Sequence, residues 1–381
     1  MSRIARAKTA IPVLWHSECR GIPMAIATAD GIQKMAVREG YSVQFYESCE
    51  ALLQNQPDCR SVIVIGFESS NMSGVLVKLQ LAKKRIVVTG VDTDHMDVSY
   101  SCVSFSRRLA TEQLLDYLLE KGCRRIAMVG TDNRSSNDMV HIDAMQSYCQ
   151  RRAGVICGHF GYGDVIEESF EAFTDVWKQH DAVLCPNAFT SVLFLRFCQQ
   201  KGLQVPRDFL LVSIKDNDIN RYCKPSLTSL VVDYFGIGQQ SVGVWTYLQD
   251  PANADFRIRI AQHGELVVRE STGIDLPIEK ENSRSPLDES YGGGAFYQIP
   301  SIRGLMQLER CLQVCDELDL RILSLLAEGK NYETICEQLF LSESSLQYRT
   351  RKLFRAAHTS GKREFTRLLT DYFTLENHFA G

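Results

Sequence analysis

Short apolar runs alternate with longer segments of helical periodicity between about residues 11 and 230. This alternation predicts parallel sheets with helices on both faces. Seven such runs are more than one open sheet usually holds, so we expect a two-lobed α/β body. The predicted strands are 11–15, 42–46, 61–66, 85–89, 125–130, 182–185 and 209–214, and the predicted helices are 24–40, 106–122, 139–153, 167–180 and 190–202.

The composition changes between residues 275 and 301. Three of the ten prolines (Pro277, Pro286 and Pro300) and the glycine run 292–294 fall here, which is typical of a flexible linker. Beyond it, residues 302–381 have helical periodicity and almost no strand signal. The 381-residue chain is therefore predicted to consist of an α/β body (1–274), a linker (275–301) and a small all-α domain (302–381).

Charge and cysteine usage restrict the partners and the compartment. The 42 Lys and Arg against 46 Asp and Glu give a net charge of -4, so a surface for nucleic acid must be local. The thirteen cysteines contain no C-x-x-C pair, which favours buried reduced thiols over a disulfide framework. With no signal-peptide pattern and no long apolar run, we expect a cytoplasmic protein without a membrane partner.

No motif of catalysis or metal binding occurs. There is no phosphate-binding P-loop and no G-x-S-x-G nucleophile motif, and the dinucleotide fingerprint fails because Ser241 stands where Gly236 and Gly238 would need a third glycine. The eight histidines lack metal-ligand spacing. We therefore expect no catalytic residue, no metal and no cofactor, and not an enzyme. The glycine-rich stretch 158–163 is predicted to be a turn-rich loop.

The C-terminal segment has the layout of two helices joined by a short turn. Asn331 is suited to cap a helix over Tyr332–Leu339, and Ser342 one that runs to Phe354. From Ser344 to residue 367 there are seven basic residues and one acidic residue. A basic second helix after a turn is typical of helix-turn-helix DNA readers. The alternative is a solvated basic face on an ordinary helical appendage.

The runs Leu325–Gly329 and Ile335–Leu346 resemble the LuxR-type helix-turn-helix, whose usual sequence is close to LLAEG followed by EIAERLFLSESTV. The resemblance covers about residues 315–373, and Leu318 and Cys336 depart from it outside the reading face. It implies binding to double-stranded operator DNA and a fourth helix, 363–373, for dimer contacts. By position it implies base contacts from Gln347, Tyr348 and Arg351, phosphate contacts from Arg349, Lys352 and Arg355, and Ser344 as a further DNA-binding residue.

The body is similar to the effector-binding domain of the lac-repressor family. The similarity lies in the segments 109–115, 120–130, 181–187, 201–208, 226–230 and 265–273, in the family's order. It implies a periplasmic-binding-protein-like fold with two lobes, three crossovers and a small-molecule cleft. We expect the crossovers near Gly122, Leu230 and Phe256. The lobes would then comprise about 11–122 with 231–256, and 123–230 with 257–274.

The same resemblance implies a set of ligand contacts. That family commonly grips sugar hydroxyls with an Asp, an Arg, an Asn and a second Asp. The corresponding positions here hold Phe105, His141, Asn187, and Lys215 followed by Asp216, so only the Asn is plainly kept. Losing charged hydrogen-bonding groups should weaken binding of hydroxyl-rich sugars. The candidates to replace them are Glu18, Arg20 and Arg107.

The family normally carries its DNA-binding headpiece at the front, and residues 1–10 are too short for one, so we expect the reader at the C-terminus. The leading hypothesis is a cytoplasmic, homodimeric, sequence-specific transcription regulator. A sugar-like or related small molecule would control it by changing the placement of two readers. The alternatives are a solute receptor that does not bind DNA, and a regulator with a vestigial cleft that a protein partner controls.

Overall fold

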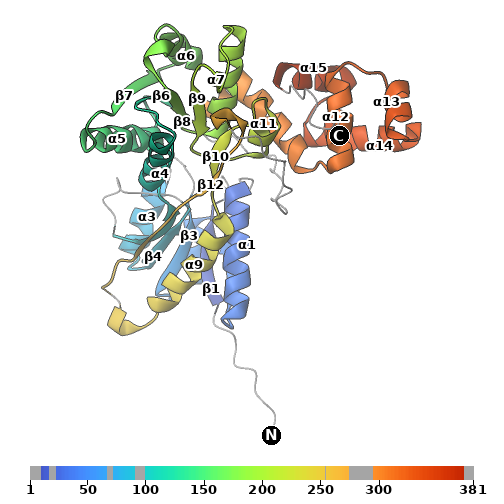
Figure 1. Ribbon diagram of the computed structural model, residues 1–381. Helices are drawn as coiled ribbons and strands as arrows, with labels where there is room; N and C mark the ends of the chain where they lie inside the picture. Colours follow the sequence, from blue (N-terminus) through green and yellow to red (C-terminus); the bar gives the residue numbers. More distant parts are fainter. Residues whose placement is uncertain are drawn as a thin grey trace. The chain divides into compact units, whose positions relative to one another are not determined.

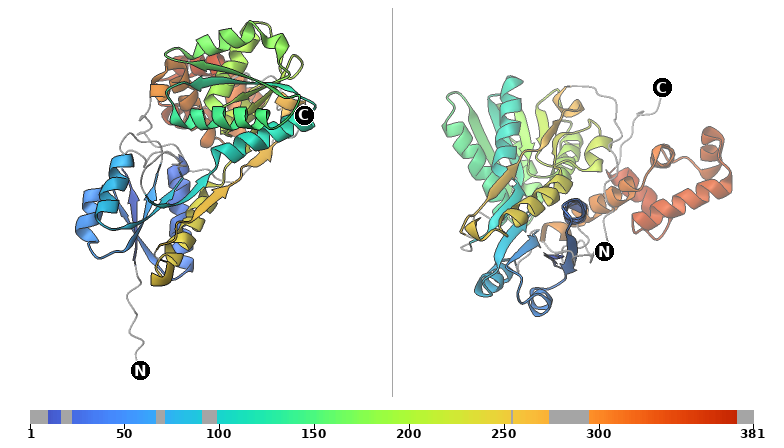
Figure 2. Two further views of the ribbon diagram at one scale, coloured as in Figure 1. Left: turned by 90° about the vertical axis from the view of Figure 1, so that its left-hand side faces the viewer. Right: turned by 90° about the horizontal axis from the view of Figure 1, so that it is seen from below.

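The computed structural model describes residues 10–16, 23–66, 72–90, 99–253, 255–273 and 295–372. The chain divides into two compact units, and each contains a six-stranded sheet between layers of helices (Figures 1 and 2). The first unit contains the described residues up to Ser106, those of the segment Val232–Gly264, and residues 295–297. The second contains Arg107–Val231, the described residues from Glu265 to Gly273, and the helices beyond Gln298.

The first unit has an all-parallel sheet. Its central strand, β3 (Ser61–Ile65), is buried along its whole length, as parallel strands covered on both faces are. Its elements are β1 (Ala10–Trp15), α1 (Pro23–Arg38), β2 (Ser42–Tyr46), α2 (Cys49–Asn55), β3, α3 (Met72–Leu81), β4 (Arg85–Thr89), β5 (Ser101–Phe105), α9 (Tyr234–Tyr247) and β11 (Arg259–Gln262). The strand order is β11-β5-β4-β3-β1-β2.

Helices α1 and α9 lie side by side in the first unit (Figure 1). They approach closely at two glycines. A Cβ added to Gly31 would lie 2.0 Å from the carbonyl oxygen of Phe235, and one added to Gly238 would lie 2.1 Å from that of Thr28. The Gly236-Ile237-Gly238 run that fails as a dinucleotide fingerprint is therefore part of a helix, and Gly238 permits close backbone contact.

The second unit has a mixed sheet in which only β12 is antiparallel, to β10. Its α/β elements are α4 (Arg107–Glu120), β6 (Arg125–Asp132), α5 (Ser136–Gln150), β7 (Ile156–Tyr162), α6 (Ile166–Thr174), β8 (Ala182–Cys185), α7 (Ala188–Gln200), β9 (Leu210–Ser213), α8 (Asp218–Tyr222), β10 (Thr228–Val231) and β12 (Glu265–Val267). The strand order is β12-β10-β9-β8-β6-β7. Helices α4 and α5 pack together, while buried phenylalanines fill the layer under α6 and α7, with Phe173 in contact with Phe194 and Phe209.

The described C-terminal segment is helical throughout. It contains α10 (Ala295–Gln298), α11 (Pro300–Gln313), α12 (Glu317–Ala327), α13 (Tyr332–Leu339), α14 (Glu343–Ala356) and α15 (Lys362–Tyr372). Helix α11 buries Leu305, Leu308 and Leu312 and contacts α7 and α8 as well as α14 and α15. It therefore joins the α/β part of the second unit to the helices that follow.

Two crossovers differ from the sequence prediction. The chain enters the second unit after Ser106, not near Gly122, because α4 packs against α5 of that unit. The third crossover follows Gly264 and does not lie near Phe256, because β11 pairs with β5 in the first sheet. The middle crossover, after Val231, lies one residue from the predicted Leu230.

Three local predictions are also corrected. The stretch 158–163 is not a loop: Ile156–Tyr162 pairs with β6 as an edge strand, and edge strands need little apolar content. Cys149 and Cys157 form a disulfide between the end of α5 and β7, so not every thiol is free. Helix begins at Ala295, inside the predicted linker 275–301, whose earlier part lies outside the described residues. Within the part of the chain that the structure describes, no helix is long and apolar enough to cross a membrane.

Candidate functional sites

Helix α14 has three distinct faces, and the first is its core face. Leu346, Thr350 and Leu353 are buried. The hydroxyl of Tyr332 on α13 donates to Thr350 Oγ1 at 3.1 Å. Ser342 caps the helix by accepting the amide hydrogen of Ser345 at 3.2 Å, as its sequence position predicts. These contacts fix how α14 is rotated against α13.

The second face of α14 is bound to α12. Arg349 Nη1 lies 2.7 Å from Asp319 Oδ1 and 2.8 Å from Asp316 Oδ2, and Lys352 Nζ lies 2.9 Å from Asp319 Oδ2. The two aspartates also form the capping box at the start of α12, and the Asp319 side chain has 0% exposure. Two of the predicted phosphate contacts, Arg349 and Lys352, are therefore occupied in holding two helices together.

The third face is the exposed face of α14. At about 100° per residue, its members fall within an arc of about 100°. Tyr348 is 75% exposed. The amide nitrogen of Gln347 donates to Glu343 Oε1 at 3.0 Å, which leaves the side chain at the surface. The exposed face comprises Ser344, Gln347, Tyr348, Arg351 and Arg355, all from the predicted DNA-binding set.

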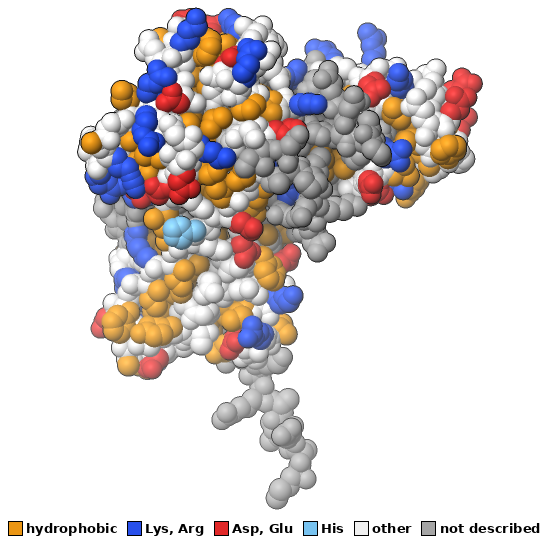
Figure 3. All heavy atoms as spheres, viewed as in Figure 1, with side chains coloured by type: hydrophobic (Ala, Val, Ile, Leu, Met, Phe, Trp, Pro, Cys, Tyr) orange, Lys and Arg blue, Asp and Glu red, His pale blue; other side chains and the backbone are white. Residues whose placement is uncertain are grey.

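The turn before α14 exposes an apolar side chain. Phe340 ends α13 in the left-handed region, with φ of 53°, and is 95% exposed. A non-glycine residue in that conformation is strained, and such residues are concentrated at functional sites. The outer side of α13 carries Glu333 and Glu337, and Figure 3 shows acidic side chains gathered over this helix. Positive charge suited to a phosphate backbone therefore lies on α14 and not on α13.

Glu309 joins α11 to the sheet of the second unit. Its buried carboxylate accepts the amide hydrogens of Asp218 and Ile219, at 3.1 Å and 2.9 Å, where α8 begins. The loop before α8 carries Lys215 and Asp216, which are both in the predicted ligand set. A displacement of this loop would therefore disturb the hydrogen bonds of Glu309 and so the position of α11.

The strand order places a possible ligand site in the second unit. Strand β6 lies between β7 and β8, so the chain turns in opposite directions after β6 and after β8. In such sheets, ligands bind beyond the carboxyl ends of the strands at this switch point. Asn187 lies there, but its amide oxygen accepts the amide hydrogen of Thr190 at 3.0 Å and so caps α7. Its amide nitrogen and the second lone pair of its amide oxygen could serve a ligand.

His141 on α5 is buried against α4. Its Nδ1 lies 2.8 Å from Thr111 Oγ1, and that hydroxyl donates to the carbonyl oxygen of Arg107 at 2.9 Å. Which atom donates between Nδ1 and the Thr111 hydroxyl depends on the tautomer of the ring. Burial lowers the pKa of His141 well below its ordinary value, and the charges of Arg107 and Lys215 lower it further. The ring is therefore neutral at physiological pH.

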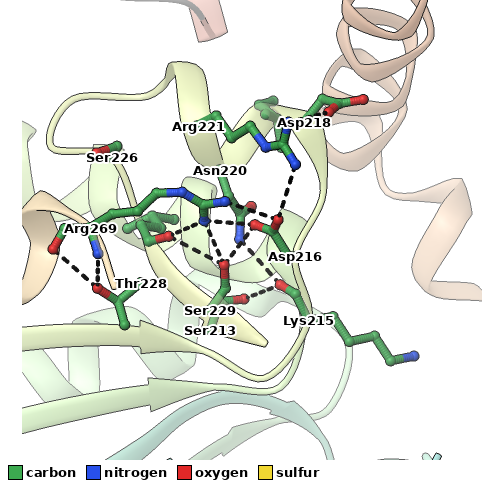
Figure 4. A network of polar contacts seen from close by, with 12 residues as sticks. Ser213, Lys215, Asp216, Asp218, Asn220, Arg221, Ser226, Thr228, Ser229 and Arg269 are labelled. Atoms are coloured by element: carbon green, nitrogen blue, oxygen red, sulfur yellow. Dashed lines mark hydrogen bonds and ion pairs between the residues drawn. The ribbon is translucent and has the colours of Figure 1, made fainter. Parts of the chain in front are cut away.

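Asp216 is bound within the protein (Figure 4). Its carboxylate has 0% exposure and receives Arg269 in a fork, at 2.8 Å to Oδ1 and 3.0 Å to Oδ2. Ser229 also donates to Oδ1, at 2.6 Å. Figure 4 shows the ammonium group of Lys215 pointing away from this network. Asp216 is thus a poor ligand contact, because a ligand would have to displace Arg269 from it.

The remaining predicted contacts are not brought together in what the structure describes. Phe105 is buried in β5 of the first unit. Glu18 and Arg20 lie outside the described residues. No group of three or more His, Cys, Asp or Glu among the described residues could hold a metal ion. Sequence reasoning missed Arg269 and Glu309, because their partners lie about fifty and ninety positions away and no local pattern marks them.

Comparisons with known proteins show the fold of the α/β body. The family model for a periplasmic binding protein-like domain matches residues 115–272. The body has that fold. Catabolite control protein A of Staphylococcus epidermidis is 22% identical over 225 residues, which cover 54% of this chain and 66% of that protein. The transcriptional regulator GalR of Streptococcus thermophilus is 23% identical over 229 residues, which cover 56% and 66%.

Solved structures agree on the fold. A LacI family transcriptional regulator from Enterococcus faecium, solved with bound ribose, matches with a TM-score of 0.51 at 16% identity and covers 71% of this chain and 100% of that one. Such a likeness shows the fold alone. The chain spans 66% of the length of the two curated relatives above.

Proposed function

We propose that this chain is a cytoplasmic, sequence-specific, DNA-binding transcription regulator. Its periplasmic-binding-protein-like body would sense a small molecule, and helices α12–α14 would bind operator DNA as a homodimer. The observation that carries the proposal is the exposed face of α14, where Tyr348, Arg351 and Arg355 are exposed beside the half-buried Gln347. These are the residue types that read base edges and bind phosphates.

Because Arg349 and Lys352 hold α14 to α12, we assign the proposed DNA contacts to other residues of α14. Arg349 and Lys352 are both paired with Asp319. The base and phosphate contacts would therefore be made by Arg351 and Arg355, which lie on the exposed face. Gln347 and Tyr348 lie beside them, and a helix that enters the major groove presents just such a stripe. Similarity to the regulators GalR and catabolite control protein A supports a role in transcription, although it covers the body and not these helices.

Signal transfer would use α11. A ligand at the carboxyl edge of the second sheet would contact the loop that carries Lys215, and Glu309 of α11 binds the same loop where α8 begins. Helix α11 also packs against α14 and α15. A ligand can act in this way only by binding one placement of the loop more tightly than another.

The test is selection of bound fragments from the source genome, with purified full chain. We expect an enriched two-fold sequence for the wild type. Arg351→Ala should weaken binding to it by about 1–3 kcal/mol and relax its sequence preference. Arg207→Ala, an exposed arginine of the α/β part of the second unit, is the matched control and should change nothing.

Two outcomes would contradict the DNA-binding proposal. Footprints unchanged by Arg351→Ala and by Arg355→Ala would remove the exposed face of α14 from the interface. No enrichment at low or at physiological salt would favour a solute receptor, or a regulator that acts through a protein partner at this surface.

A further inference from the structure

We propose that Cys149 and Cys157 form a reversible oxidation site, at which a peroxide-class oxidant closes the disulfide and a thiol reductant opens it. The inference goes beyond DNA binding and rests on one part of the proposed function, the cytoplasmic location. The pair joins a helix to a strand of the second unit. Cys149 lies in the last turn of α5, and Cys157 is the second residue of β7.

The disulfide is an exception among the cysteines of this chain. Ten other cysteines that the structure describes are free thiols. Disulfides that serve stability belong to oxidising compartments. In the cytoplasm, glutathione and thioredoxin keep thiols reduced, and the disulfides found there are usually transient and catalytic or redox-sensing. One bonded pair beside many free thiols fits the cytoplasmic case.

Both cysteines of the pair are within reach of a dissolved oxidant. Each is half-buried, and the loop between them, residues 151–155, is exposed at four of its five positions. Other thiols of the second unit are buried, and burial raises the pKa of Cys123 to about 11 and that of Cys198 and Cys223 to about 12. Oxidants react with the thiolate, so these buried thiols are inert. Redox-sensing cysteines are accessible and lie next to a second cysteine.

The backbone holds the two cysteines together through contacts that involve no sulfur. The amide of Arg152 donates to the carbonyl oxygen of Cys149 at 3.1 Å, and that of Ile156 donates to the carbonyl oxygen of Arg124 at 2.8 Å. Strand β7 then pairs with β6. The two Cα atoms lie 6.5 Å apart, within the range that a disulfide spans. Reduced thiols therefore stay adjacent and can form the bond again without refolding.

Helix α5 is also held to α4 independently of the disulfide. The Tyr148 hydroxyl donates to Asp116, and Arg152 pairs with the same carboxylate at 3.0 Å. Arg151 pairs with Glu112 at 2.7 Å. These contacts keep α5 in place when the disulfide opens. Opening would therefore release the start of β7, which lies at the edge of the described sheet and pairs there with β6 alone.

The oxidation is balanced with hydrogen peroxide as the oxidant. One thiolate attacks a peroxide oxygen, the O–O bond breaks, and a sulfenic acid and hydroxide result. The hydroxide takes up the proton that the thiol released and becomes water. The second thiol attacks the sulfenic sulfur, the S–S bond forms, and a second water leaves. In the reverse direction, two glutathione molecules reduce the bond by thiol–disulfide exchange and leave as glutathione disulfide.

The test is mass spectrometry of the full chain after defined redox treatment. Free thiols are blocked with iodoacetamide, and the fraction of chains in which Cys149 and Cys157 are joined is measured. We expect reduced glutathione at cytoplasmic concentration to open the bond in most chains. Hydrogen peroxide, added after the glutathione is removed, should close it again.

Stability and hydrogen exchange measure the consequence of opening. The reduced chain should melt about 5 °C lower, because the bond no longer restricts the unfolded chain. Exchange should become faster at residues 151–158 and stay unchanged in the first unit. Cys149→Ser and Cys157→Ser should each behave like the reduced chain under both conditions. Cys59→Ser, which removes a half-buried thiol of the first unit, is the matched control and should keep the redox response.

Three outcomes would overturn the inference. A bond that resists glutathione would be a permanent structural disulfide. Thiols that peroxide leaves unjoined would not be an oxidation site. Equal exchange in the oxidised and reduced chains would mean that the bond controls no part of the structure.

These outcomes are independent of DNA binding. If the genomic selection enriches an operator while the bond resists glutathione, this inference fails and the DNA-binding proposal stands. If the bond opens and closes while no fragment is enriched, the DNA-binding proposal fails and this inference stands.

Discussion

Arg349 on α14 forms an ion pair with Asp319 on α12, with 2.7 Å between Nη1 and Oδ1. The Asp319 side chain is fully buried, whereas Arg349 remains partly accessible. The hydrogen bonds to Asp316 and Asp319 raise the pKa of Arg349. This pair explains why the number of basic residues in α14 overstates the positive charge that the helix can offer to DNA.

Arg349→Met should therefore mainly reduce stability, whereas Arg351→Met should mainly reduce DNA binding. Arg349→Met leaves the buried Asp319 carboxylate with Lys352 as its remaining cation and should destabilise the C-terminal helices by about 1–3 kcal/mol. Arg351→Met, two positions away and exposed, should leave stability within about 0.5 kcal/mol and weaken DNA binding. Hydrogen exchange of α12 and α14 measures the first effect, and equal exchange in the two variants would contradict the assignment.

Gly238→Ala should destabilise the first unit by about 3 kcal/mol. The Cβ of an alanine at 238 would lie 2.1 Å from the Thr28 carbonyl oxygen. Relieving this clash requires the two packed helix backbones to separate, which costs free energy. Gly243→Ala, on the same helix with nothing within 4 Å, should stabilise by about 0.5–1 kcal/mol through helix propensity. Urea unfolding of both variants tests this contrast, which fails if the two shifts have the same sign.

Glu309→Ala should loosen the connection between α11 and α8. It leaves the amide hydrogens of Asp218 and Ile219 without their acceptor, which should cost about 1–3 kcal/mol for each buried donor. Hydrogen exchange should become faster at α8 and α11 and stay unchanged in the first unit. Glu309→Gln keeps the shape and one acceptor, so its effect should be smaller. Unchanged exchange in Glu309→Ala would show that the contact carries no stability.

Stability should fall as the pH falls below about 6.5, partly because of His141. Its pKa is lowered in the folded state, so below the unfolded-state value of about 6.5 the unfolded chain takes up a proton that the folded chain does not. This difference costs about 1.4 kcal/mol per pH unit until the folded pKa is reached. Burial lowers the pKa of His159 and His180 in the same direction. Denaturant midpoints from pH 8 to 5 should show a shallower slope in His141→Gln, and an equal slope would contradict the burial of a neutral ring.

Local patterns located most of the α/β framework. The apolar runs at 42–46, 85–89 and 182–185 are strands with the predicted bounds. The prediction failed where the local pattern was weak. Strand β7 contains two glycines and lies at the sheet edge, and helix α9 contains Gly238, which permits close contact with α1. Neither reason is visible without the partner element.

The sequence by itself determined the alternation of strands and helices, a separate helical segment beyond about residue 302 and the set of residues on α14, because periodicity and capping act within a few neighbouring positions. Only the tertiary structure decided which of those residues are available. Arg349 and Arg351 have the same chemistry and lie two positions apart, yet one is bound to Asp319 and the other is exposed. Likewise, Arg269 occupies Asp216 from 53 positions away. Such pairings depend on which faces of distant elements meet, and local sequence does not fix that.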